Sequence, residues 1–455
     1  MDSPDSTATD RATTARERRR VALATTIGTT IEWYDFFIYA SAAGLVFAQL
    51  YFRPAGDQIA LLLSFGSVGV SFLFRPLGAF LAGHLGDLIG RKAMLVLTLI
   101  LMGAATTLIG VLPTYDSAGV LAPVCLLILR ILQGLSAGGE WGGAILMAVE
   151  HAPEGRRGRF GAFPQLGPPL GLLAASGMFA LMAVIAPGEA FAAWGWRVPF
   201  LFSVVLIAVG LIVRTRVAES PVFTELAQRR QRTTVPIARL FRFHTPIVIL
   251  AALTFAGNNA AGYMTTGGYI QNYATNPAGP LGLERAPVLL AVTASAVVWG
   301  LSTWIGGTLS DRIGRRTTYL IGWGCQLLTV FPMFWLVNTG DLWLLGLGLA
   351  LFTIGNGLTY GPQAAFFAEL FPASIRYSGV AISYAIGAIL GGAFAPTIAT
   401  ALVQQFGSTN AVAVYLAVLT VIAAAATFLL RDRTGIPLGP EHEQAQSRGT
   451  TILSS

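Results

Sequence analysis

Five charged side chains lie within long apolar stretches of this sequence, where a charge is costly and usually serves a function. They are Glu32, Asp35, Arg75, Arg130 and Glu140. A carboxylate in such a place loses its charge by desolvation or keeps it beside an arginine, so it can bind and release a proton. We therefore predict that Asp35 carries an exchangeable proton, with Glu32 and Glu140 as the alternatives.

The two arginines are candidates for binding an anion. An arginine fork can hold a carboxylate through two parallel hydrogen bonds. A helix rises about 1.5 Å per residue. Asp35 therefore lies about 21 Å from the inner edge of its apolar stretch, and Arg130 lies about 16 Å from the outer edge of its own. Both fall near the middle of a bilayer core about 30 Å thick. We expect Arg130 beside Asp35 or Glu32, and Arg75 beside Glu140, and we predict that both arginines bind substrate. The alternative is that these charges only brace helices against one another.

Neutral polar side chains are further candidates for substrate binding. Tyr39 shares one helical face with Glu32 and Asp35, at spacings of three and seven residues, so all three are expected to point into the same interior. The adjacent amides Asn258 and Asn259 are the best candidates, because two amides in an apolar span are costly without partners. The other candidates are Gln133, Gln165, Tyr263, Tyr360 and Gln363. Hydrogen bonding between helices is the alternative role for each of them.

A charged motif occurs twice, which indicates a duplicated chain. Residues 83–92 and 307–316 are similar, and Asp87 and Asp311 are 224 positions apart. A glutamate followed seven residues later by an arginine repeats at an offset of 219. We expect these charges to pin neighbouring helices and to gate a conformational cycle, with simple anchoring of the loops as the alternative. The gating candidates are Asp87, Arg91, Asp311, Arg315, Glu150, Arg157, Glu369 and Arg376.

The elements that position these residues are predicted to be membrane helices. The chain of 455 residues is 54% hydrophobic and 11% charged, whereas a soluble domain carries about 25% charged residues. About 20 apolar residues span a bilayer as a helix. We predict an all-α membrane protein with twelve transmembrane helices, arranged as two six-helix bundles related by the internal repeat. The predicted spans are 21–47, 58–83, 92–112, 119–147, 160–186, 197–214, 245–271, 287–309, 317–338, 341–366, 378–403 and 411–430.

The distribution of Lys and Arg predicts the orientation. With the N-terminus inside, cytoplasmic segments hold 24 of the 29 basic residues and outer segments hold three. We therefore expect a protein of the cytoplasmic (inner) membrane with both termini in the cytoplasm. The basic residues are spread over all the cytoplasmic loops, which argues against nucleic-acid binding. The predicted divisions are a disordered cytoplasmic tail (1–20), a first bundle (21–214), a cytoplasmic linker (215–243), a second bundle (244–431) and a cytoplasmic tail (432–455).

Signatures of soluble enzymes, cofactors and metals are lacking in the sequence. No phosphate-binding Gly-rich loop of the Gly-x-x-x-x-Gly-Lys-Ser/Thr type is present. The four histidines, His84, His151, His244 and His442, are expected near cytoplasmic boundaries and do not form a ligand cluster. The two cysteines have no metal-ligand spacing. We therefore expect neither an enzyme nor a cofactor or metal site.

Several strings in the chain resemble known signatures. The repeated motif and the string around Arg130 resemble those of the major facilitator superfamily. Further strings resemble those of its metabolite:proton symporter family, and the resemblance covers about residues 20–430. One departure is Leu88, where the loop signature often has Arg; we expect weaker latching there. The strings that carry the resemblance are 83–92, 307–316, 130–134, 28–39, 74–78, 138–143 and 219–223.

The resemblance implies transport by alternating access of two bundles, driven by proton symport. Members of the family carry small carboxylates such as 2-oxoglutarate, citrate and shikimate, or betaine and proline. We predict a proton-coupled symporter of a small organic acid that acts as a monomer, with the substrate, protons and the lipid bilayer as its partners. The alternatives are a carrier of a zwitterion such as betaine or proline, a sugar or a drug, with or without proton coupling, and a membrane sensor built on the same fold.

Overall fold

A computed structural model describes residues 4–89, 91–138, 140–215, 240–242, 244–266, 268–277, 279–447 and 451. Within these ranges it gives no account of the side chains at 4–16, 82–95, 214–215, 263–266 and 440. The described residues form helices joined by short connections, and they include no strand beyond an isolated bridge between Leu430 and Thr451.

The first half of the chain contains six membrane helices, some of them made of two or three joined segments. Its elements are α1 (Pro4–Ala42), η1 (Ala43–Phe47), α2 (Ala48–Tyr51), η2 (Arg53–Ala55), α3 (Asp57–Ile89), α4 (Arg91–Val111), α5 (Tyr115–Ala118), α6 (Leu121–Ala137), α7 (Glu140–Glu150), α8 (Arg157–Gln165), α9 (Gly167–Ile185), η3 (Phe191–Gly195) and α10 (Arg197–Thr215).

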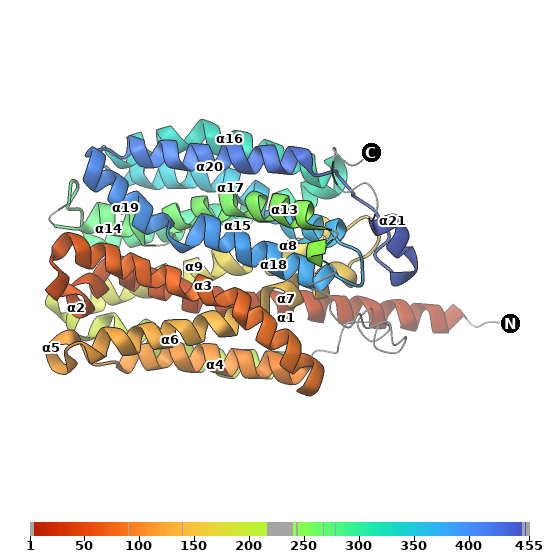
Figure 1. Cartoon of the computed structure of the whole chain (residues 1–455), viewed down its shortest axis with the longest axis horizontal. Helices are drawn as coiled ribbons and strands as arrows, with labels where there is room; N and C mark the ends of the chain where they lie inside the picture. The colour runs from red at the N-terminus through yellow and green to blue at the C-terminus, as the bar shows by residue number, and fades with distance from the viewer. Residues whose placement is uncertain are drawn as a thin grey trace.

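The second half repeats this arrangement and adds a short C-terminal segment. Its elements are α13 (Thr245–Thr266), α14 (Tyr269–Thr275), α15 (Arg285–Ile313), α16 (Arg315–Val337), α17 (Leu342–Leu370), α18 (Arg376–Ala388), η4 (Ile389–Ala393), α19 (Ala395–Phe406), α20 (Asn410–Leu429), η5 (Pro440–His442) and α21 (Glu443–Ser447). In Figure 1, α4 and α6 lie along one side of the bundle, and α16 and α20 lie along the other.

Twelve membrane helices are present, as predicted. Ten stretches of the described residues are long and apolar enough to cross a bilayer by themselves. The other two are α1, whose apolar part carries Glu32 and Asp35, and α4, whose apolar part is the shorter stretch Val96–Val111. Both chain ends lie at the same end of the bundle (Figure 1), which we call the terminal end.

The helices extend further at the terminal end than hydropathy predicts. α3 continues to Ile89 and α4 begins at Arg91, so most of the motif at 83–92 belongs to helix ends rather than to a loop. Its copy is similar: α15 ends at Ile313, and α16 begins at Arg315. The turn between them is made by Gly314 with φ of 92°, a conformation that favours glycine. The apolar stretch ends where charged residues begin, whereas the helix itself ends only where its backbone hydrogen bonding is interrupted.

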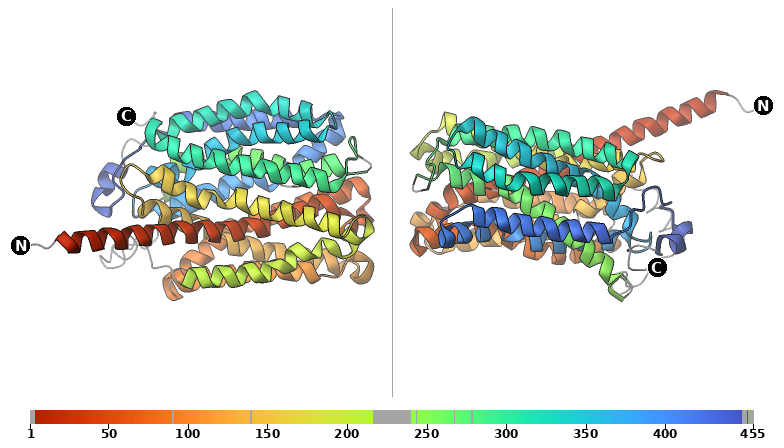
Figure 2. Two further views of the ribbon diagram at one scale, coloured as in Figure 1. Left: turned by 180° about the vertical axis from the view of Figure 1, so that it is seen from behind. Right: turned by 90° about the horizontal axis from the view of Figure 1, so that it is seen from above.

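The N-terminal tail also differs from the prediction. We expect disorder over residues 1–20, but α1 starts at Pro4 and extends beyond the body of the molecule (Figure 2). Proline is tolerated in the first turn of a helix. The Ala and Arg residues that follow it, and Glu17, favour a helix although several of them are charged.

The two halves of the chain contact each other at the end of the bundle opposite to the terminal end. Asn272 Nδ2, on α14, donates a hydrogen bond of 2.7 Å to the carbonyl oxygen of Gly44 in the first half. Gly268 lies in the left-handed region with φ of 87°, and a Cβ atom there would come within 2.2 Å of the Ala40 carbonyl oxygen. This close approach requires glycine, so the backbones of the two halves meet directly at this end.

Candidate functional site

The second copy of the repeated motif is the centre of a buried ion-pair network at the terminal end. Arg315 Nη1 lies 2.6 Å from Asp311 Oδ1. The same guanidinium donates to both oxygens of Glu369, at 3.2 Å from Nε and 3.3 Å from Nη2. The side chains of Arg315 and Glu369 are 1% and 0% exposed. Such a two-pronged geometry fixes the orientation of both partners.

This network joins the two halves of the protein. Asp311 accepts hydrogen bonds from the backbone N–H groups of Gly158, at 2.7 Å, and Arg159, at 2.8 Å. These groups lie in the first turn of α8, where backbone donors have no partner within the helix and attract a negative charge. A carboxylate of the second half therefore caps a helix of the first half. The sequence could not reveal this contact, since 152 residues separate Asp311 from Arg159.

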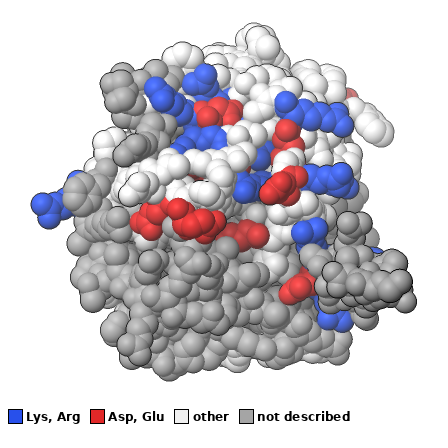
Figure 3. Space-filling view, turned by 90° about the vertical axis from the view of Figure 1, so that its right-hand side faces the viewer, with Lys and Arg blue, Asp and Glu red and all other residues white. Residues whose placement is uncertain are grey.

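Two further ion pairs cross between the halves at the same end. Arg157 lies 3.6 Å from Glu369, and Arg376 lies 3.5 Å from Glu150. Together with Asp311 and Arg315 these residues form what we call the terminal latch. Figure 3 shows acidic and basic side chains interleaved on this face. The predicted gating residues Glu150, Arg157, Asp311, Arg315, Glu369 and Arg376 thus lie in one network, whereas the side chains of Asp87 and Arg91 lie outside the described residues.

The C-terminal tail reinforces the terminal latch, a role that its polar composition does not predict. The carbonyl oxygen of Ile436 accepts from Arg157, and that of Leu438 accepts from Arg376 at 3.0 Å. Gln446 Oε1 accepts from Arg376 Nη2 at 3.1 Å. The tail therefore binds two guanidinium groups that already pair across the halves.

A weaker latch is expected to open the terminal end. Asp311→Asn removes the charge that pairs with Arg315 and caps α8. Removing one partner of a buried pair costs about 3–5 kcal/mol, so we expect the population open at the terminal end to rise at least tenfold. Spin labels at the exposed positions Glu154 and Arg312 should report longer distances by double electron–electron resonance.

The matched control for this experiment is Asp432→Asn. Asp432 accepts from the backbone N–H of Arg316 at 2.9 Å, within the second half alone. Its removal should leave the distance between the labels unchanged. Equal distance distributions for Asp311→Asn and the parent protein would contradict a gating role for the latch.

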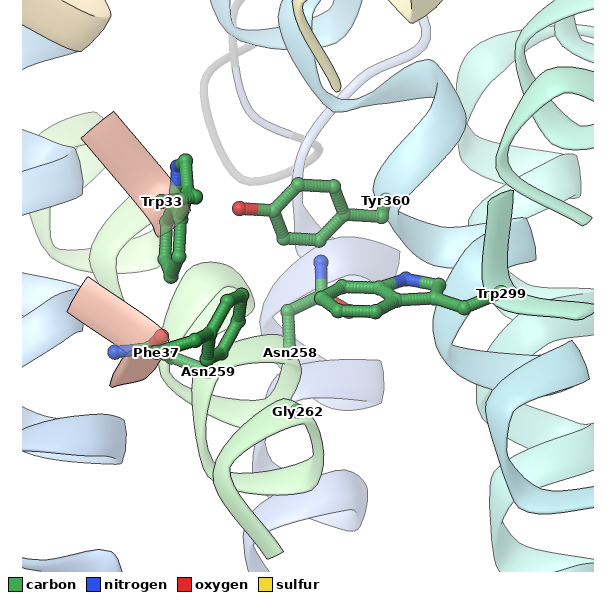
Figure 4. Close-up of a pocket in the computed structure, with 7 residues that line it drawn as sticks. All are labelled: Trp33, Phe37, Asn258, Asn259, Gly262, Trp299 and Tyr360. Carbon is green, nitrogen blue, oxygen red and sulfur yellow. The ribbon is translucent and has the colours of Figure 1, made fainter. Parts of the chain in front are cut away.

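A pocket lies between the two halves. It is lined by Trp33 and Phe37 from α1 and, from the second half, by Asn258, Asn259, Gly262, Trp299 and Tyr360. Figure 4 shows these side chains around a common space, with the Tyr360 hydroxyl directed towards Trp33. Its cavity volume is about 10 Å³, roughly the room of one water molecule. Its lining is aromatic and amide, and carries no charged side chain.

An amide network extends from this pocket into the first half. Gln363 Oε1 accepts from Asn258 Nδ2 and from Gln165 Nε2, both at 3.4 Å. Gln165 also donates to the carbonyl oxygen of Tyr360 at 3.1 Å, so α8 is joined to α17 beside the pocket. Asn259 donates to the carbonyl oxygen of Ala388 at 3.1 Å. The predicted residues Asn258, Asn259, Tyr360, Gln165 and Gln363 are thus gathered in one region; the side chain of Tyr263 lies outside the described residues.

Several buried N–H donors around the pocket find no acceptor among the described residues. They include the ring nitrogens of Trp33 and Trp299 and the Nε2 of Gln363. Burying a donor without a partner costs about 1–3 kcal/mol. Oxygen acceptors of a ligand would satisfy these donors.

Arg75 does not line this pocket and lies behind Phe36, at the interface between the halves. It is 1% exposed, and its guanidinium carbon lies 4.4 Å from the centroid of the Phe72 ring and 5.2 Å from that of Phe36. Phe36 in turn contacts Trp33, with ring centroids 5.7 Å apart. Across the interface, Arg75 lies close to Tyr384 of α18. Its Nε and Nη1 atoms find no hydrogen-bond acceptor among the described residues, and rings rather than Glu140 surround it.

Asp35 lies inside the first half and not in the pocket. It is 1% exposed, and its Oδ1 accepts from the Ser203 hydroxyl at 2.6 Å. The Thr106 hydroxyl is also within hydrogen-bonding reach, and Glu140 is near enough to interact electrostatically. Its contacts are therefore hydroxyl groups rather than the arginine that we expect from depth.

Arg130 is held by other groups of the first half. Its Nη1 donates to Gln133 Oε1 at 3.0 Å, and its Nη2 donates to the carbonyl oxygen of Val68 at 3.2 Å. Its guanidinium lies 4.0 Å from the ring centroid of Tyr39. Glu32, Asp35 and Tyr39 are all buried, as the helical spacing predicts, but they contact different neighbours: Glu32 lies near Tyr384, across the interface between the halves.

Sequence reasoning missed several residues of the site. The aromatic lining of the pocket from α1, Trp33 and Phe37, is spaced four residues apart on one helical face, a signal that was available. The roles of Ser203 and Thr106 had no such signal, because single hydroxyl groups are common in membrane helices.

Comparison with known proteins gives a consistent result. A family model described as Major Facilitator Superfamily matches residues 25–389. The chain is 40% identical over 424 residues to the inner membrane metabolite transport protein YhjE of Escherichia coli (strain K12), covering 92% of this chain and 96% of that protein. It is 36% identical to the shikimate transporter of the same strain, covering 94% and 98%. The solved structure of the proton:xylose symporter XylE has a TM-score of 0.76 at 17% identity, covering 95% and 99%, which shows a shared fold.

Proposed function

The chain belongs to the Major Facilitator Superfamily and is a transporter of metabolites rather than an enzyme, and from this premise we propose that it carries a small organic acid into the cell together with protons. Its position in the inner membrane follows that of its bacterial relative. The substrate would bind in the pocket between the halves, and the two ends of the bundle would open in turn.

The observation that carries this proposal is the excess of unpaired N–H donors around the pocket. Arg75, Trp33, Trp299 and Gln363 all present such donors. The Nε and Nη1 atoms of Arg75 have no acceptor among the described residues, and a carboxylate accepts two parallel hydrogen bonds from a guanidinium. The donor set therefore suits a ligand with a carboxylate and further oxygen acceptors. Shikimate, named for one relative, is a ring carboxylate with three hydroxyl groups and is the first substrate to test.

Proton coupling is proposed at Asp35, with Glu32 and Glu140 as alternatives. Asp35 is buried in the first half and bonded to hydroxyl groups that can either donate or accept, so both its protonated and its ionised form can be accommodated. Contacts join the two halves at both ends of the bundle, as an occluded step in alternating access would require.

Uptake into proteoliposomes tests the proposed function. Labelled shikimate and other small carboxylates should accumulate when the outside is acidic and should only equilibrate without a pH gradient. Uptake of betaine or a sugar in place of any carboxylate would favour the alternative of a zwitterion or sugar carrier. The aromatic lining of the pocket supports that alternative, because Trp rings attract quaternary ammonium groups.

The orientation is likewise proposed, from the bias of basic residues: the terminal end faces the cytoplasm. In a Cys125→Ser, Cys325→Ser background, Ala55→Cys should react with an impermeant thiol reagent from outside, and Val235→Cys only after permeabilisation. Labelling of Val235→Cys in intact cells would reverse the assignment.

A further inference from the structure

A chain of hydrogen bonds runs from Arg130 through Gln133 to Thr106 within the first half and ends beside Asp35. Arg130 Nη1 donates to Gln133 Oε1 at 3.0 Å, and Gln133 Nε2 donates to Thr106 Oγ1 at 2.8 Å. The Thr106 hydroxyl lies within reach of the Asp35 carboxylate. Arg130, Gln133 and Thr106 are all 0% exposed. Arg130 and Gln133 thus both donate in the direction of the aspartate, whereas the Thr106 hydroxyl donates to the Met102 carbonyl oxygen at 2.9 Å.

The Thr106 hydroxyl is the element that can switch. It has one hydrogen, and its oxygen already accepts from Gln133. Its hydrogen has two possible acceptors, the carbonyl oxygen of Met102 at 2.9 Å and the carboxylate of Asp35. An ionised carboxylate is the stronger acceptor, so Thr106 turns to Asp35 when Asp35 is charged. When Asp35 is protonated, the hydrogen returns to the Met102 carbonyl.

We propose that Thr106 and Gln133 form a relay through which Arg130 responds to the protonation of Asp35. The proposal rests on the proposed function and adds two positioning residues to it. With Asp35 ionised, the hydrogen bonds polarise one another and hold Arg130 on Gln133. With Asp35 protonated, this hold weakens.

The relay reaches the proposed carboxylate site through one aromatic ring. The ring centroid of Phe36 lies 4.5 Å from the guanidinium carbon of Arg130 and 5.2 Å from that of Arg75. A shift of Arg130 thus changes the packing of the ring against which Arg75 rests. Through this contact protonation of Asp35 alters the binding of an anion at Arg75, and symport requires that it strengthen this binding.

Other charged or titratable groups of the described residues also lie around Asp35. Glu140 on α7 interacts with it electrostatically, and Tyr34 is adjacent on α1, with its hydroxyl donating to the Pro199 carbonyl at 2.8 Å. Glu32 lies one turn away on α1, and Arg75 is on α3. Since none of these takes part in the relay, variants of Gln133 and Thr106 separate the relay from them.

The first test needs no substrate. The infrared band of the protonated Asp35 carboxyl group is identified by its loss in Asp35→Asn, and the pH at which it is half-formed is measured. Two variants should each raise that pH by about one unit, because each weakens hydrogen-bond donation to the ionised Asp35 carboxylate. They are Thr106→Val and Gln133→Met, of which the second changes a residue that is linked to Asp35 only through Thr106. Thr106→Ser, which keeps the hydroxyl, should behave as the parent protein. So should Thr107→Val, whose hydroxyl donates only to the Gly103 carbonyl, at 2.8 Å.

The second test uses shikimate as the probe. Its dissociation constant should rise with pH in the parent protein and should lose most of this pH dependence in Thr106→Val and Gln133→Met. An unchanged infrared midpoint in Gln133→Met would overturn the relay. If Asp35→Asn removes no band and retains proton-driven uptake, the proton site of the proposed function is wrong instead, and the two failures are thereby distinguished.

Discussion

Replacing Asp35 with asparagine (Asp35→Asn) is expected to abolish substrate accumulation driven by a proton gradient while substrate exchange across the membrane survives. Asparagine keeps the size of the side chain, and its carbonyl oxygen can still accept from the Ser203 hydroxyl, which lies 2.6 Å from Asp35. It cannot bind or release a proton. The conformational cycle should therefore continue without being coupled to the gradient.

The size of this effect follows from the energy of the gradient. A proton moving down one pH unit releases about 1.4 kcal/mol, which supports about tenfold accumulation for each proton coupled. Parent protein in proteoliposomes should reach this ratio for a labelled carboxylate, and Asp35→Asn should stay at a ratio of about one. Counterflow of labelled against unlabelled substrate should proceed in both.

The other two carboxylates provide the comparison for this result. Glu32→Gln and Glu140→Gln remove buried carboxylates of the same helical bundle, and Glu140 lies near Asp35. If accumulation persists in Asp35→Asn and is lost in one of these variants, that residue carries the proton. If it persists in all three, the assignment of coupling to this cluster is wrong.

The fold could be predicted from the sequence because the solvent imposes it. A helix must satisfy its own backbone groups in lipid, so apolar stretches translate directly into spans, and the repeated charges reveal two halves. Helix ends were less accurate: α3 continues to Ile89 and α17 to Leu370, because charged residues that leave the bilayer core still favour a helix.

The partners of the buried charges could not be predicted in the same way. Helical spacing places Asp35 on an inward face, and depth alone places it near Arg130, but neither determines which neighbour it meets. The structure brings Ser203 to Asp35 from 168 residues away, and Gln133 to Arg130 from three residues away. The depth of a residue in the membrane does not say on which side of the bundle its helix lies. The packing of the helices decides which side chains meet, and the spacing of residues along one helix does not predict that packing.

Arg75 illustrates the same point with a consequence for specificity. Depth suggests Glu140 as its partner, which would make it a structural ion pair. The structure instead surrounds it with the rings of Phe36 and Phe72 and leaves two of its nitrogen atoms without an acceptor among the described residues. A guanidinium placed in this way is available to a ligand, so the proposed carboxylate site moves from Arg130 to Arg75.

Arg75→Lys is accordingly expected to weaken binding of a carboxylic acid about 10- to 100-fold, since a hydrogen bond to a charged group is worth about 1.5–3 kcal/mol and lysine lacks the planar fork. The primary amide of the same acid binds without that charged pair, so its affinity should change by less than about threefold. Equilibrium binding of shikimate and of its amide, measured by calorimetry on the purified protein at one acidic pH, gives both values.

Arg130→Lys is the matched control, because Arg130 is a second fully buried arginine of the first half that donates to Gln133 and to the Val68 carbonyl. At an acidic pH that keeps Asp35 protonated, the relay is released in the parent protein and the variant alike, so Arg130→Lys should alter acid and amide binding to a similar extent, through packing against Tyr39. The opposite pattern, with selective loss of the acid in Arg130→Lys alone, would place the carboxylate at Arg130. Equal loss of acid and amide in both variants would mean that the two arginines only brace the helices, and the organic-acid assignment would lose the donor set on which it rests.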